Sequence, residues 1–415
     1  MYFLYNISVY IIGFLLKIIA PFNKKINLFV AGRKNVFEKL EAAIKPNDTI
    51  IWFHCASLGE FEQGRPIIEK AKQRYPNHKI LLTFFSPSGY EIRKNYGCAD
   101  FVAYLPLDTK KNAQRLLQII NPEIAIFIKY EFWPNLLKVL RSQNIKTILV
   151  SGIFRKEQSF FKSYGRWMRK SLQTFDHFFV QNNRSKGLLE SIGFLNVTVS
   201  GDTRFDRVFD ITQQDNTLAF AEQFTGRHIT LIAGSTWPKD EELLVSYINT
   251  NADANQKFII APHNINANDI LKLKERISKN TILYSERKNK RLEDYQVLII
   301  DTIGLLSKIY NYADIAYVGG GFGSGIHNIL EPATFGVPIL IGPTYHKFKE
   351  AVDLVKLGAC EVITNQSEFN AIATTLFTNA KIRKQKGAVS GNYILKNVGA
   401  TDIIVKYLDN TINKK

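Results

Sequence analysis

Cysteine is scarce in this sequence: 415 residues contain three, Cys55, Cys98 and Cys360, and none belongs to a Cys-x-x-Cys pair. So few cysteines exclude a disulfide framework and a thiolate zinc site, and they are typical of a protein from a reducing compartment. The loops that follow the predicted strands also lack His-Glu-x-x-His, Asp-x-Asp and any cluster of Cys and His. We therefore expect neither a bound metal ion nor a cofactor. Helix dipoles and cationic side chains would then meet the negative charge at a site.

Acidic residues are also few, with 37 Asp and Glu against 54 Lys and Arg, so the formal net charge is +17. A basic chain favours an acidic partner, and nucleic acid and an anionic membrane surface are the usual ones. The sequence contains no recognisable nucleic-acid-binding module, which counts against a nucleic-acid-binding protein. Hydrophobic residues make up 46% of the chain, which excludes an intrinsically disordered protein.

Long apolar runs are absent after the first 22 residues. Residues 1–22 contain one charged residue, Lys17. A helix that crosses a bilayer needs about 20 apolar residues, so this segment is just long enough. No basic stretch precedes the segment and no small-x-small site ends it, which argues against a cleaved signal peptide.

Basic residues follow this apolar segment directly, at Lys24, Lys25, Arg33 and Lys34. The positive-inside rule then leaves the rest of the chain in the cytoplasm, at the inner (cytoplasmic) membrane. Two other interpretations stay open. The segment could be a buried N-terminal helix, and Lys17 also allows a helix that lies in the membrane interface instead of crossing it.

From residue 48 onward, short apolar runs alternate with amphipathic stretches, a pattern typical of parallel βαβ units. The first group of predicted strands covers residues 49–55, 79–85, 101–105, 124–128, 146–150 and 178–181. After a polar stretch near 203–225, a second group covers 229–233, 258–261, 281–284, 297–300, 315–318, 338–341 and 361–364. We therefore predict an anchor at 1–22 and two doubly wound α/β domains at 23–210 and 211–415. Because such sheets bind ligands at the carboxyl ends of their strands, two of them facing each other would place a ligand in the cleft between them.

Two carboxylates follow predicted strands in the first half of the chain. Glu60 ends the segment His-Cys-Ala-Ser-Leu-Gly-Glu, where a carboxylate could act as a general base toward a substrate hydroxyl. The alternative is a glutamate that satisfies the dipole at the start of a helix. Glu131 lies beside Trp133 and is a second candidate, with a polar lid over an aromatic plug as its alternative.

Glycine-rich turns mark the second half. Ala-Gly-Ser-Thr at 233–236 closes one predicted strand, and five glycines occur within residues 319–325 before a predicted helix. Such a loop allows backbone to approach a ligand and aims a helix N-terminus at an anion. We expect His327 and Asn328 in the first turn of that helix and Glu331 one turn on, placed to accept hydrogen bonds from ribose hydroxyls. The spacing matches neither Gly-x-Gly-x-x-Gly nor a P-loop, and a flexible loop without function is the alternative.

These motifs together resemble the 3-deoxy-D-manno-octulosonic acid (Kdo) transferases, glycosyltransferase family 30. The resemblance rests on the segments 57–60, 131–135, 201–206, 233–236 and 327–333. It implies the GT-B architecture, with two Rossmann-like domains facing a cleft. It also implies inverting, metal-independent transfer of Kdo from CMP-Kdo to a lipid A precursor, lipid IVA, in lipopolysaccharide core biosynthesis.

The resemblance also implies roles for individual residues. Glu60 would be the general base, and Glu131 and Arg204 would stabilise the transition state. The residues implied to bind the CMP moiety are Ser235, Pro262, His263, Ile303, Gly304, Leu305, Asn328, Ile329, Leu330 and Glu331. The chain departs from the family at three of its positions: His263 replaces a usual Arg, Lys129 a usual acidic residue, and Arg204 a usual Lys.

A further stretch combines aromatic and basic residues. We expect Phe160, Phe161, Tyr164, Trp167 and Met168 to share one helical face, with basic residues around it. Such a face could meet the membrane or the phosphates and acyl chains of lipid A, or it could be a core helix with a solvated basic back. For the whole chain, the alternative function is another GT-B enzyme that uses a UDP-sugar, either a lipid-linked glycosyltransferase or an epimerase.

Overall fold

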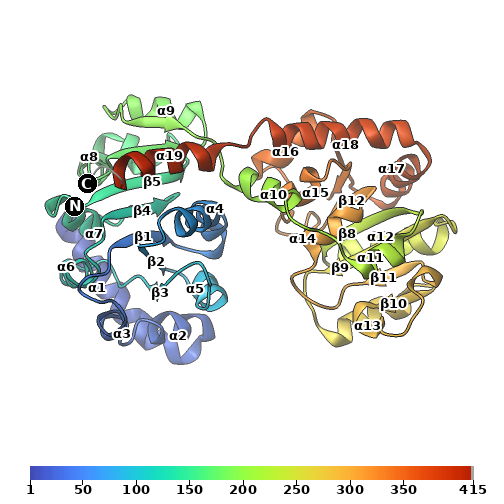
Figure 1. Ribbon diagram of the computed structural model, residues 1–415, viewed down its shortest axis with the longest axis horizontal. Coiled ribbons are helices and arrows are strands. Elements are labelled where there is room, and N and C mark those ends of the chain that lie inside the picture. The colour runs from blue at the N-terminus through green and yellow to red at the C-terminus, as the bar shows by residue number, and fades with distance from the viewer. Residues whose placement is uncertain (413–415) are drawn as a thin grey trace. The chain divides into compact units, whose positions relative to one another are not determined.

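The computed structural model describes residues 1–412, which divide into two compact units. The first unit contains Met1–Arg207 together with the chain from Val398 onward, and the second contains Val208–Asn397. Figure 1 shows the red C-terminal helix α19 (Ala400–Ile412) beside the strands of the first unit. The sequence-based division at 210/211 put this helix in the second domain, whereas the structure assigns it to the first unit.

The first unit is built on a parallel sheet with the strand order β3-β2-β1-β4-β5-β6-β7. The strands are β1 (Ile50–Cys55), β2 (Lys79–Phe84), β3 (Phe101–Tyr104), β4 (Ile124–Ile128), β5 (Lys146–Gly152), β6 (His177–Val180) and β7 (Val197–Val199). All six residues of β1 are buried, as expected where helices cover both faces of a parallel sheet. The short β7 was not among the strands predicted from the sequence.

Alternate residues of β1 point to opposite cores, as the period of two along a strand requires. Ile50 and Trp52 belong to one cluster, and Ile51 and Phe53 belong to the other. Helices of the first unit are α2 (Lys24–Ala31), α3 (Val36–Ala43), α4 (Leu58–Arg74), α5 (Pro87–Arg93), α6 (Lys110–Ile120), α7 (Pro134–Ser142), α8 (Arg166–Leu172), α9 (Asn183–Glu190) and α10 (Arg204–Thr212), which crosses into the second unit.

The second unit repeats this architecture around a parallel sheet with the order β10-β11-β9-β8-β12-β13-β14. Its strands are β8 (Ile229–Thr236), β9 (Gln256–Pro262), β10 (Thr281–Leu283), β11 (Val297–Ile299), β12 (Ile315–Val318), β13 (Ile339–Ile341) and β14 (Cys360–Val362). Its helices are α11 (Ala219–Thr225), α12 (Pro238–Thr250), α13 (Ala267–Arg276), α14 (Leu306–Ile309), α15 (Leu330–Thr334), α16 (Lys349–Lys356), α17 (Gln366–Thr378) and α18 (Ala380–Leu395). Two doubly wound α/β units are thus present, as the sequence predicted.

Each sheet has a point where the strand order reverses. In the first sheet β1 lies between β2 and β4, and in the second sheet β8 lies between β9 and β12. A crevice opens at the carboxyl ends of the strands that flank such a reversal, and ligands bind there in open α/β sheets. Glu60 lies in the first turn of α4, which follows β1, and Glu131 lies in the loop that follows β4. Ser235 lies near the end of β8, and the glycine-rich segment follows β12.

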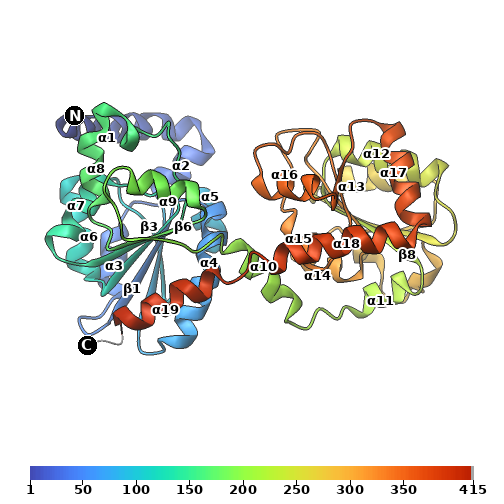
Figure 2. The same ribbon diagram turned by 90° about the horizontal axis from the view of Figure 1, so that it is seen from above.

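The first 22 residues form helix α1 (Tyr2–Ile19) and a short 3₁₀ turn. Within the described residues, Tyr2–Phe22 is the one segment long and apolar enough to cross a bilayer, with a mean hydropathy of 1.9. Figure 2 shows α1 running along the surface of the first unit, beside α8. The predicted apolar helix is therefore present.

The aromatic and basic segment does not form the single helical face that the sequence suggested. Residues 159–172 form two 3₁₀ turns, Ser159–Phe161 and Ser163–Gly165, and then the short helix α8. Phe160 is buried in the core, whereas Tyr164 is 62% exposed. The prediction of one amphipathic helix was wrong because the chain turns at the buried Gly165, whose missing Cβ would lie 1.6 Å from the carbonyl oxygen of Ser159.

A buried carboxylate fastens α19 to the first unit. Asp206 accepts hydrogen bonds from the backbone N–H groups of Gly399 (2.5 Å) and Thr401 (2.7 Å) and from the Thr401 hydroxyl (2.6 Å). The apolar face of α19 then packs with α4 on one side of the sheet. This contact is the physical reason why α19 belongs to the first unit, and sequence periodicity does not encode it.

We expect Asp206→Asn to loosen α19. An amide offers one acceptor oxygen and an NH₂ group, so at least one of the three donors would lose its partner, at a cost of about 1–3 kcal/mol. Hydrogen exchange of the α19 amides should accelerate roughly 10- to 100-fold. The control is Asp402→Asn in the same helix, because this exposed partner of Lys70 contributes little. Equal exchange rates in the two variants would contradict this role for Asp206.

Candidate functional site

Glu60 lies in the first turn of α4, directly after β1. The Ser57 backbone N–H donates to Glu60 Oε2 at 3.0 Å, and Ser57 Oγ lies 3.5 Å from the same oxygen. This is a capping box, in which a glutamate satisfies the free N–H groups at a helix start. Glu60 therefore caps the start of α4, which was the alternative interpretation from the sequence. The hydrogen bond from Ser57 also fixes the position of the carboxylate.

The surroundings of Glu60 raise its pKa above the ordinary range of a glutamate. Burial is the largest cause, and the negative charge of Glu131 adds to it. His54, Lys129 and the hydrogen bond from the Ser57 N–H act in the opposite direction without cancelling the rise. A carboxylate whose pKa moves toward neutrality is a stronger base, which suits a role in proton removal.

Glu131 is held by the side chains around it. It is buried, and its Oε2 accepts a hydrogen bond from Trp133 Nε1 at 2.7 Å. The same oxygen lies 3.0 Å from His54 Nε2. Just before it, Lys129 adopts a left-handed backbone conformation with a φ of 73°, which turns the chain sharply at the end of β4. Glu131 is therefore positioned by partners from β1 and from its own loop.

The contacts of Glu131 continue into the sheet as one chain of hydrogen bonds. His54 Nδ1 lies 2.8 Å from Thr83 Oγ1, which accepts from Trp52 Nε1 at 2.9 Å. Trp52 Nε1–H donates to Thr83, Thr83 Oγ1 and His54 Nδ1 share a hydrogen bond, and a proton on His54 Nε2 donates to Glu131. This arrangement aims an N–H group at Glu131.

The hydrogen bonds of His54, Trp52 and Thr83 were not predicted from the sequence, in which His54 stood out only as the start of the motif that ends at Glu60. A signal was present. Positions 52 and 54 share one face of β1, and a parallel neighbour in register pairs Thr83 with His54. The register between β1 and β2 cannot be read from the sequence, so the chain of hydrogen bonds becomes visible only in the structure.

Arg204 reaches the same region through Asp202. Its Nη2 donates to Asp202 Oδ2 at 2.8 Å, and its Nε donates to the same oxygen at 3.0 Å. Gln63, one turn after Glu60 on α4, contacts the other oxygen of Asp202 at 3.4 Å. The charge of Arg204 is therefore already paired with a buried carboxylate.

In the second unit, the loop after β8 is closed by a buried aspartate. Asp240 accepts from the Trp237 N–H at 2.9 Å, the Gly320 N–H at 2.8 Å and the Tyr317 hydroxyl at 2.7 Å. It thus joins the start of α12 to the glycine-rich loop after β12. Ser235, a predicted nucleotide-binding residue, lies at this junction with a left-handed backbone (φ 54°).

Three aromatic rings stack beside this junction. Trp237 and His263 lie 4.6 Å apart, and His263 and His327 lie 4.4 Å apart, between ring centroids. Trp237 Nε1 donates to His327 Nε2 at 2.9 Å. Burial, and then the neighbouring His263, lower the pKa of His327. Because Trp237 Nε1–H can only donate, His327 Nε2 is the acceptor in this pair. The segments after β8, β9 and β12 meet at these three rings.

The glycine-rich loop differs from the expectation in two ways. His327 and Asn328 precede the helix, because α15 begins at Leu330 and has five residues. The glycines of this loop are also required for its packing against neighbouring segments. A Cβ on Gly319 would lie 2.3 Å from the Ser235 carbonyl oxygen, and one on Gly321 would lie 2.5 Å from the Cα of Gly342. These two glycines allow neighbouring loops to touch.

The other predicted nucleotide-binding residues are arranged as follows. Asn328 Nδ2 donates to Glu331 Oε1 at 3.0 Å, while Ile329 and Leu330 are buried, so their side chains face the core. Pro262 ends β9, next to His263. Ile303, Gly304 and Leu305 follow β11, which neighbours β9, and Ile303 is 84% exposed. Among residues 1–412, no three His, Cys, Asp or Glu side chains are grouped so that they could hold a metal ion.

Comparison with known proteins identifies relatives of this chain. The sequence model described as "3-Deoxy-D-manno-octulosonic-acid transferase (kdotransferase)" matches residues 32–207. The 3-deoxy-D-manno-octulosonic acid transferase of Aquifex aeolicus is 27% identical over 83% of this chain and 92% of its own length. The enzyme of the same name from Haemophilus influenzae is 26% identical over 87% of this chain and 88% of its own length.

Solved structures with the same fold include enzymes that act on different substrates. UDP-GlcNAc 2-epimerase from Neisseria meningitidis, bound to UDP-GlcNAc, has a TM-score of 0.60, with 14% identity over 88% of this chain and 100% of that one. MurG from Acinetobacter baumannii has a TM-score of 0.52, with 11% identity over 88% of this chain and 99% of that one. These likenesses show the GT-B fold, as expected from the sequence.

The coupling between the two carboxylates can be measured without any substrate. Glu131→Gln removes a negative charge that raises the pKa of Glu60, so we expect this pKa to fall. Lys129→Met removes a charge that lowers the same pKa, so we expect it to rise. Both shifts can be followed in the carboxyl ¹³C resonance of Glu60, assigned by its loss in Glu60→Gln. Equal Glu60 pKa values in all three proteins would refute the coupling.

Proposed function

We propose, from the premise that this chain belongs to the 3-deoxy-D-manno-octulosonic acid (Kdo) transferases, that it transfers Kdo from CMP-Kdo to a lipid A precursor, lipid IVA. The observation that supports this proposal best is Glu60. It is a carboxylate of raised pKa, next to Glu131, at the point where the strand order of the first sheet reverses. The reaction is a step of lipopolysaccharide core biosynthesis, and the acceptor binds to the first unit.

The reaction begins with proton removal. Glu60 accepts the proton of a sugar hydroxyl of the acceptor, and the oxygen attacks the anomeric carbon of Kdo. The bond from that carbon to the phosphate oxygen breaks, and CMP leaves with the bonding electrons. Because attack and departure occur on opposite faces in this single displacement, the anomeric configuration is inverted.

Glu131 and Arg204 stabilise charge in the transition state. Positive charge develops at the anomeric carbon as the leaving group departs, and the carboxyl group of Glu131, held by His54 and Trp133, is placed to stabilise it. Arg204 supplies a cation for the negative groups of the donor. Its pairing with Asp202 fixes the guanidinium in one orientation.

The donor nucleotide binds to the second unit. We expect Ser235, Pro262, His263, Ile303, Gly304, Leu305 and Asn328–Glu331 to contribute to this site. These residues end or follow β8, β9, β11 and β12, four neighbouring strands of one parallel sheet. CMP carries one phosphate, which holds less charge than a diphosphate. Backbone N–H groups and cationic side chains can meet that charge without a metal ion or other cofactor, so we propose metal-independent transfer.

The protein works at the inner (cytoplasmic) membrane, with both units on the cytoplasmic face. Support comes from the apolar helix α1 and the lysines that follow it. A net charge of +17 suits an anionic membrane surface. An acceptor that is itself a membrane lipid requires this location.

The principal alternative is a GT-B enzyme that uses a UDP-sugar, either a lipid-linked glycosyltransferase or an epimerase. UDP-GlcNAc 2-epimerases share the fold, although a likeness of 14% identity says nothing about the nucleotide. The two functions differ in the base that the second unit must recognise. Nucleotide binding therefore separates them.

We expect Glu60→Gln to reduce transfer about 10²- to 10⁴-fold, the usual contribution of a general base, while CMP still binds. Mass spectrometry of lipid IVA incubated with freshly generated CMP-Kdo measures the transfer. Glu69→Gln on the same helix is the control. Glu69 contacts Arg65 and Tyr96 and should leave the rate nearly unchanged. Turnover by Glu60→Gln at the normal rate would contradict the role of Glu60.

We expect CMP and CDP to raise the melting temperature of the protein, and UDP and UDP-GlcNAc to leave it unchanged. His263→Ala should weaken the CMP effect, because His263 lies in the aromatic stack at the proposed nucleotide site. The measurement is a thermal-shift titration at fixed salt. A response to UDP-GlcNAc but not to CMP would favour the alternative function.

A further inference from the structure

Helix α1 has its polar groups on the side that meets the protein and an apolar side that faces outward. The residues that are buried or partly buried include Tyr2, Tyr5, Val9, Gly13 and Leu16, which recur at helical spacing. The opposite side is exposed and almost wholly apolar; it consists of Phe3, Leu4, Ile7, Tyr10, Ile11, Ile12, Phe14, Leu15, Ile18 and Ile19. A helix of a water-soluble protein shows the reverse arrangement.

Specific hydrogen bonds hold the polar side of α1 against the first unit. The Tyr5 hydroxyl donates to Asp108 Oδ2 at 2.7 Å, and the Tyr2 hydroxyl donates to Asn135 Oδ1. Asn135 Nδ2 donates to Asn6 Oδ1 at 2.9 Å. Tyr5 also lies 6.1 Å from the ring of Trp167 on α8, measured between ring centroids.

The attachment continues along the helix. A Cβ on Gly13 would lie 2.8 Å from Leu107 Cδ1, so α1 approaches the loop after β3 most closely at a residue without a side chain. Gly13 is two turns beyond Tyr5. The contacts of α1 thus extend over three turns and are not confined to one end, which fixes the direction of its axis relative to the unit.

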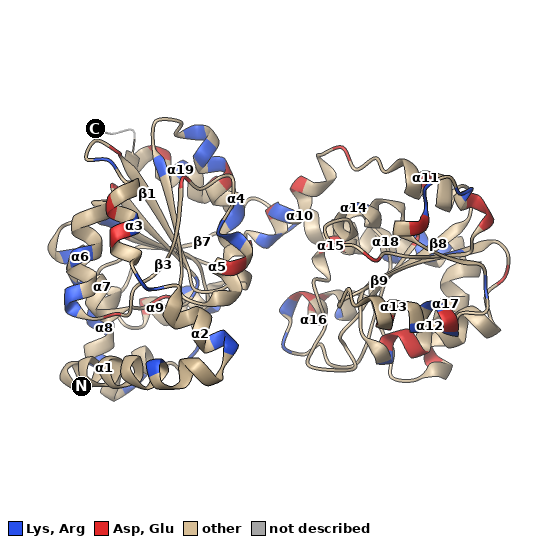
Figure 3. Cartoon of the chain, turned by 90° about the horizontal axis from the view of Figure 1, so that it is seen from below, with Lys and Arg blue, Asp and Glu red and all other residues tan. Residues whose placement is uncertain are grey.

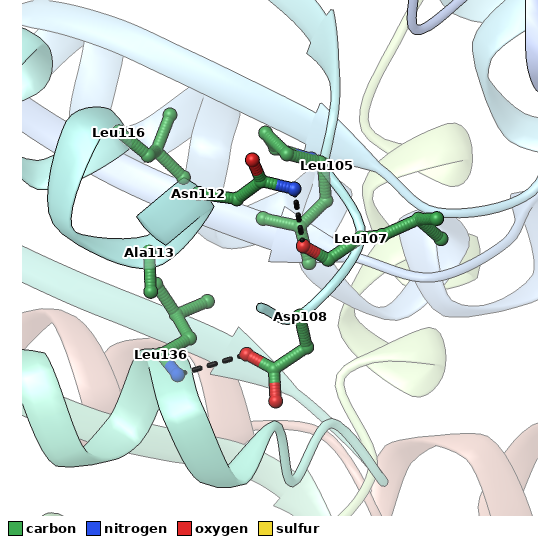
Figure 4. A pocket seen from close by; sticks show the side chains of 8 residues that line it. Leu105, Leu107, Asp108, Asn112, Ala113, Leu116 and Leu136 are labelled. Carbon is green, nitrogen blue, oxygen red and sulfur yellow. Dashed lines mark hydrogen bonds between the residues drawn. The ribbon is translucent and has the colours of Figure 1, made fainter. Parts of the chain in front are cut away.

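These attachments bear on the candidate site. Figure 4 shows Asp108 beside the start of α7, where its Oδ1 accepts from the Leu136 N–H at 2.8 Å; its Oδ2 accepts from the Asn135 N–H at 2.9 Å. The loop that carries Glu131 leads directly into α7. Asp108 therefore links α1 to the carboxyl edge of the sheet, where Glu131 lies.

We propose that α1 lies in the plane of the membrane without crossing it, with its outward face in the lipid and the carboxyl edge of the first sheet next to the bilayer surface. A crossing helix would have to leave these contacts and carry Tyr2, Tyr5 and Asn6 into a membrane with their hydrogen bonds broken. This inference rests on the membrane association proposed above and adds how the helix is oriented.

The charges around α1 suit an anionic lipid surface. Figure 3 shows α1 tan over nearly its whole length, with basic residues on the neighbouring α2. Lys17, Lys24 and Lys25 are exposed cations on α1 and at the start of α2, and Lys138, Arg166 and Lys170 are exposed cations on α7 and α8. Lys138 lies over the ring of Tyr2 at 5.1 Å. Cations beside an apolar helix face are typical of helices that bind anionic membranes in the interface.

Such an orientation has a use in the proposed reaction. A lipid acceptor keeps its acyl chains in the bilayer and presents its sugar at the surface. An enzyme that lies with its sheet edge at that surface can receive the sugar hydroxyl near Glu60 and Glu131 without extracting the lipid.

The depth of α1 in the membrane distinguishes the two orientations. In full-length protein carrying Cys98→Ser, bimane is attached at Phe3→Cys, Ile11→Cys or Ile18→Cys, all on the exposed side. Quenching by doxyl lipids is measured in phosphatidylethanolamine–phosphatidylglycerol vesicles. Residues 3 and 18 are about 22 Å apart along a helix, at 1.5 Å per residue. A helix in the plane gives three similar depths, about 5–10 Å below the headgroups. A crossing helix places residue 11 deepest and overturns the proposal.

A cross-link tests the docking in the same vesicles. Gly13→Cys with Leu107→Cys should form a disulfide on oxidation, whereas Ile11→Cys with Leu107→Cys, which points away, should not. Equal yields in the two pairs, or none in the first, would contradict the docked helix. Absence of quenching at all three bimane positions would remove both the orientation and the membrane association. The role of Glu60 is tested separately, with detergent-dispersed acceptor.

Discussion

Backbone N–H groups that become buried at the ends of strands need acceptors, and in this protein buried aspartate side chains provide them. Asp108 accepts from the first turn of α7, Asp240 from the glycine-rich loop and Asp206 from the start of α19. In every case one carboxylate joins segments that are distant in the sequence. Two of these contacts, those of Asp108 and Asp240, hold segments that follow β4 and β12, so both candidate sites contain such a carboxylate or lie beside one.

The two carboxylates of the first unit are held in different ways, and this difference favours different chemistry. Glu131 receives hydrogen bonds from Trp133 and from His54, which hold its carboxylate in one position. Glu60 receives an N–H bond within its own capping box, but burial and the charge of Glu131 raise its pKa. A carboxylate whose pKa is raised by burial and by a second carboxylate is typical of acid–base sites.

The features that depend on local sequence pattern were predicted correctly. Buried strands, the two doubly wound sheets and the carboxyl-end loops follow from apolar runs that alternate with amphipathic segments. The features that depend on contacts between residues distant in the sequence were not predicted. The packing of α19 depends on Asp206, and the hydrogen bonds from Trp52 to Glu131 depend on the register of β1 with β2. The turn at Gly165, which divides the helix expected to carry Phe160 to Met168 on one face, depends on close contact with Ser159.

The same distinction explains why hydropathy alone leaves the role of α1 open. An average over 18 residues treats Tyr2, Tyr5 and Asn6 as small interruptions of an apolar segment, which is how a crossing helix appears. The structure shows that these residues share one side and that each finds a partner on the protein. Once the polar groups of a helix are satisfied by its own domain, only its apolar side remains to be covered. A lipid surface that covers that side need not surround the helix, so an apolar segment of spanning length can serve as a lateral anchor.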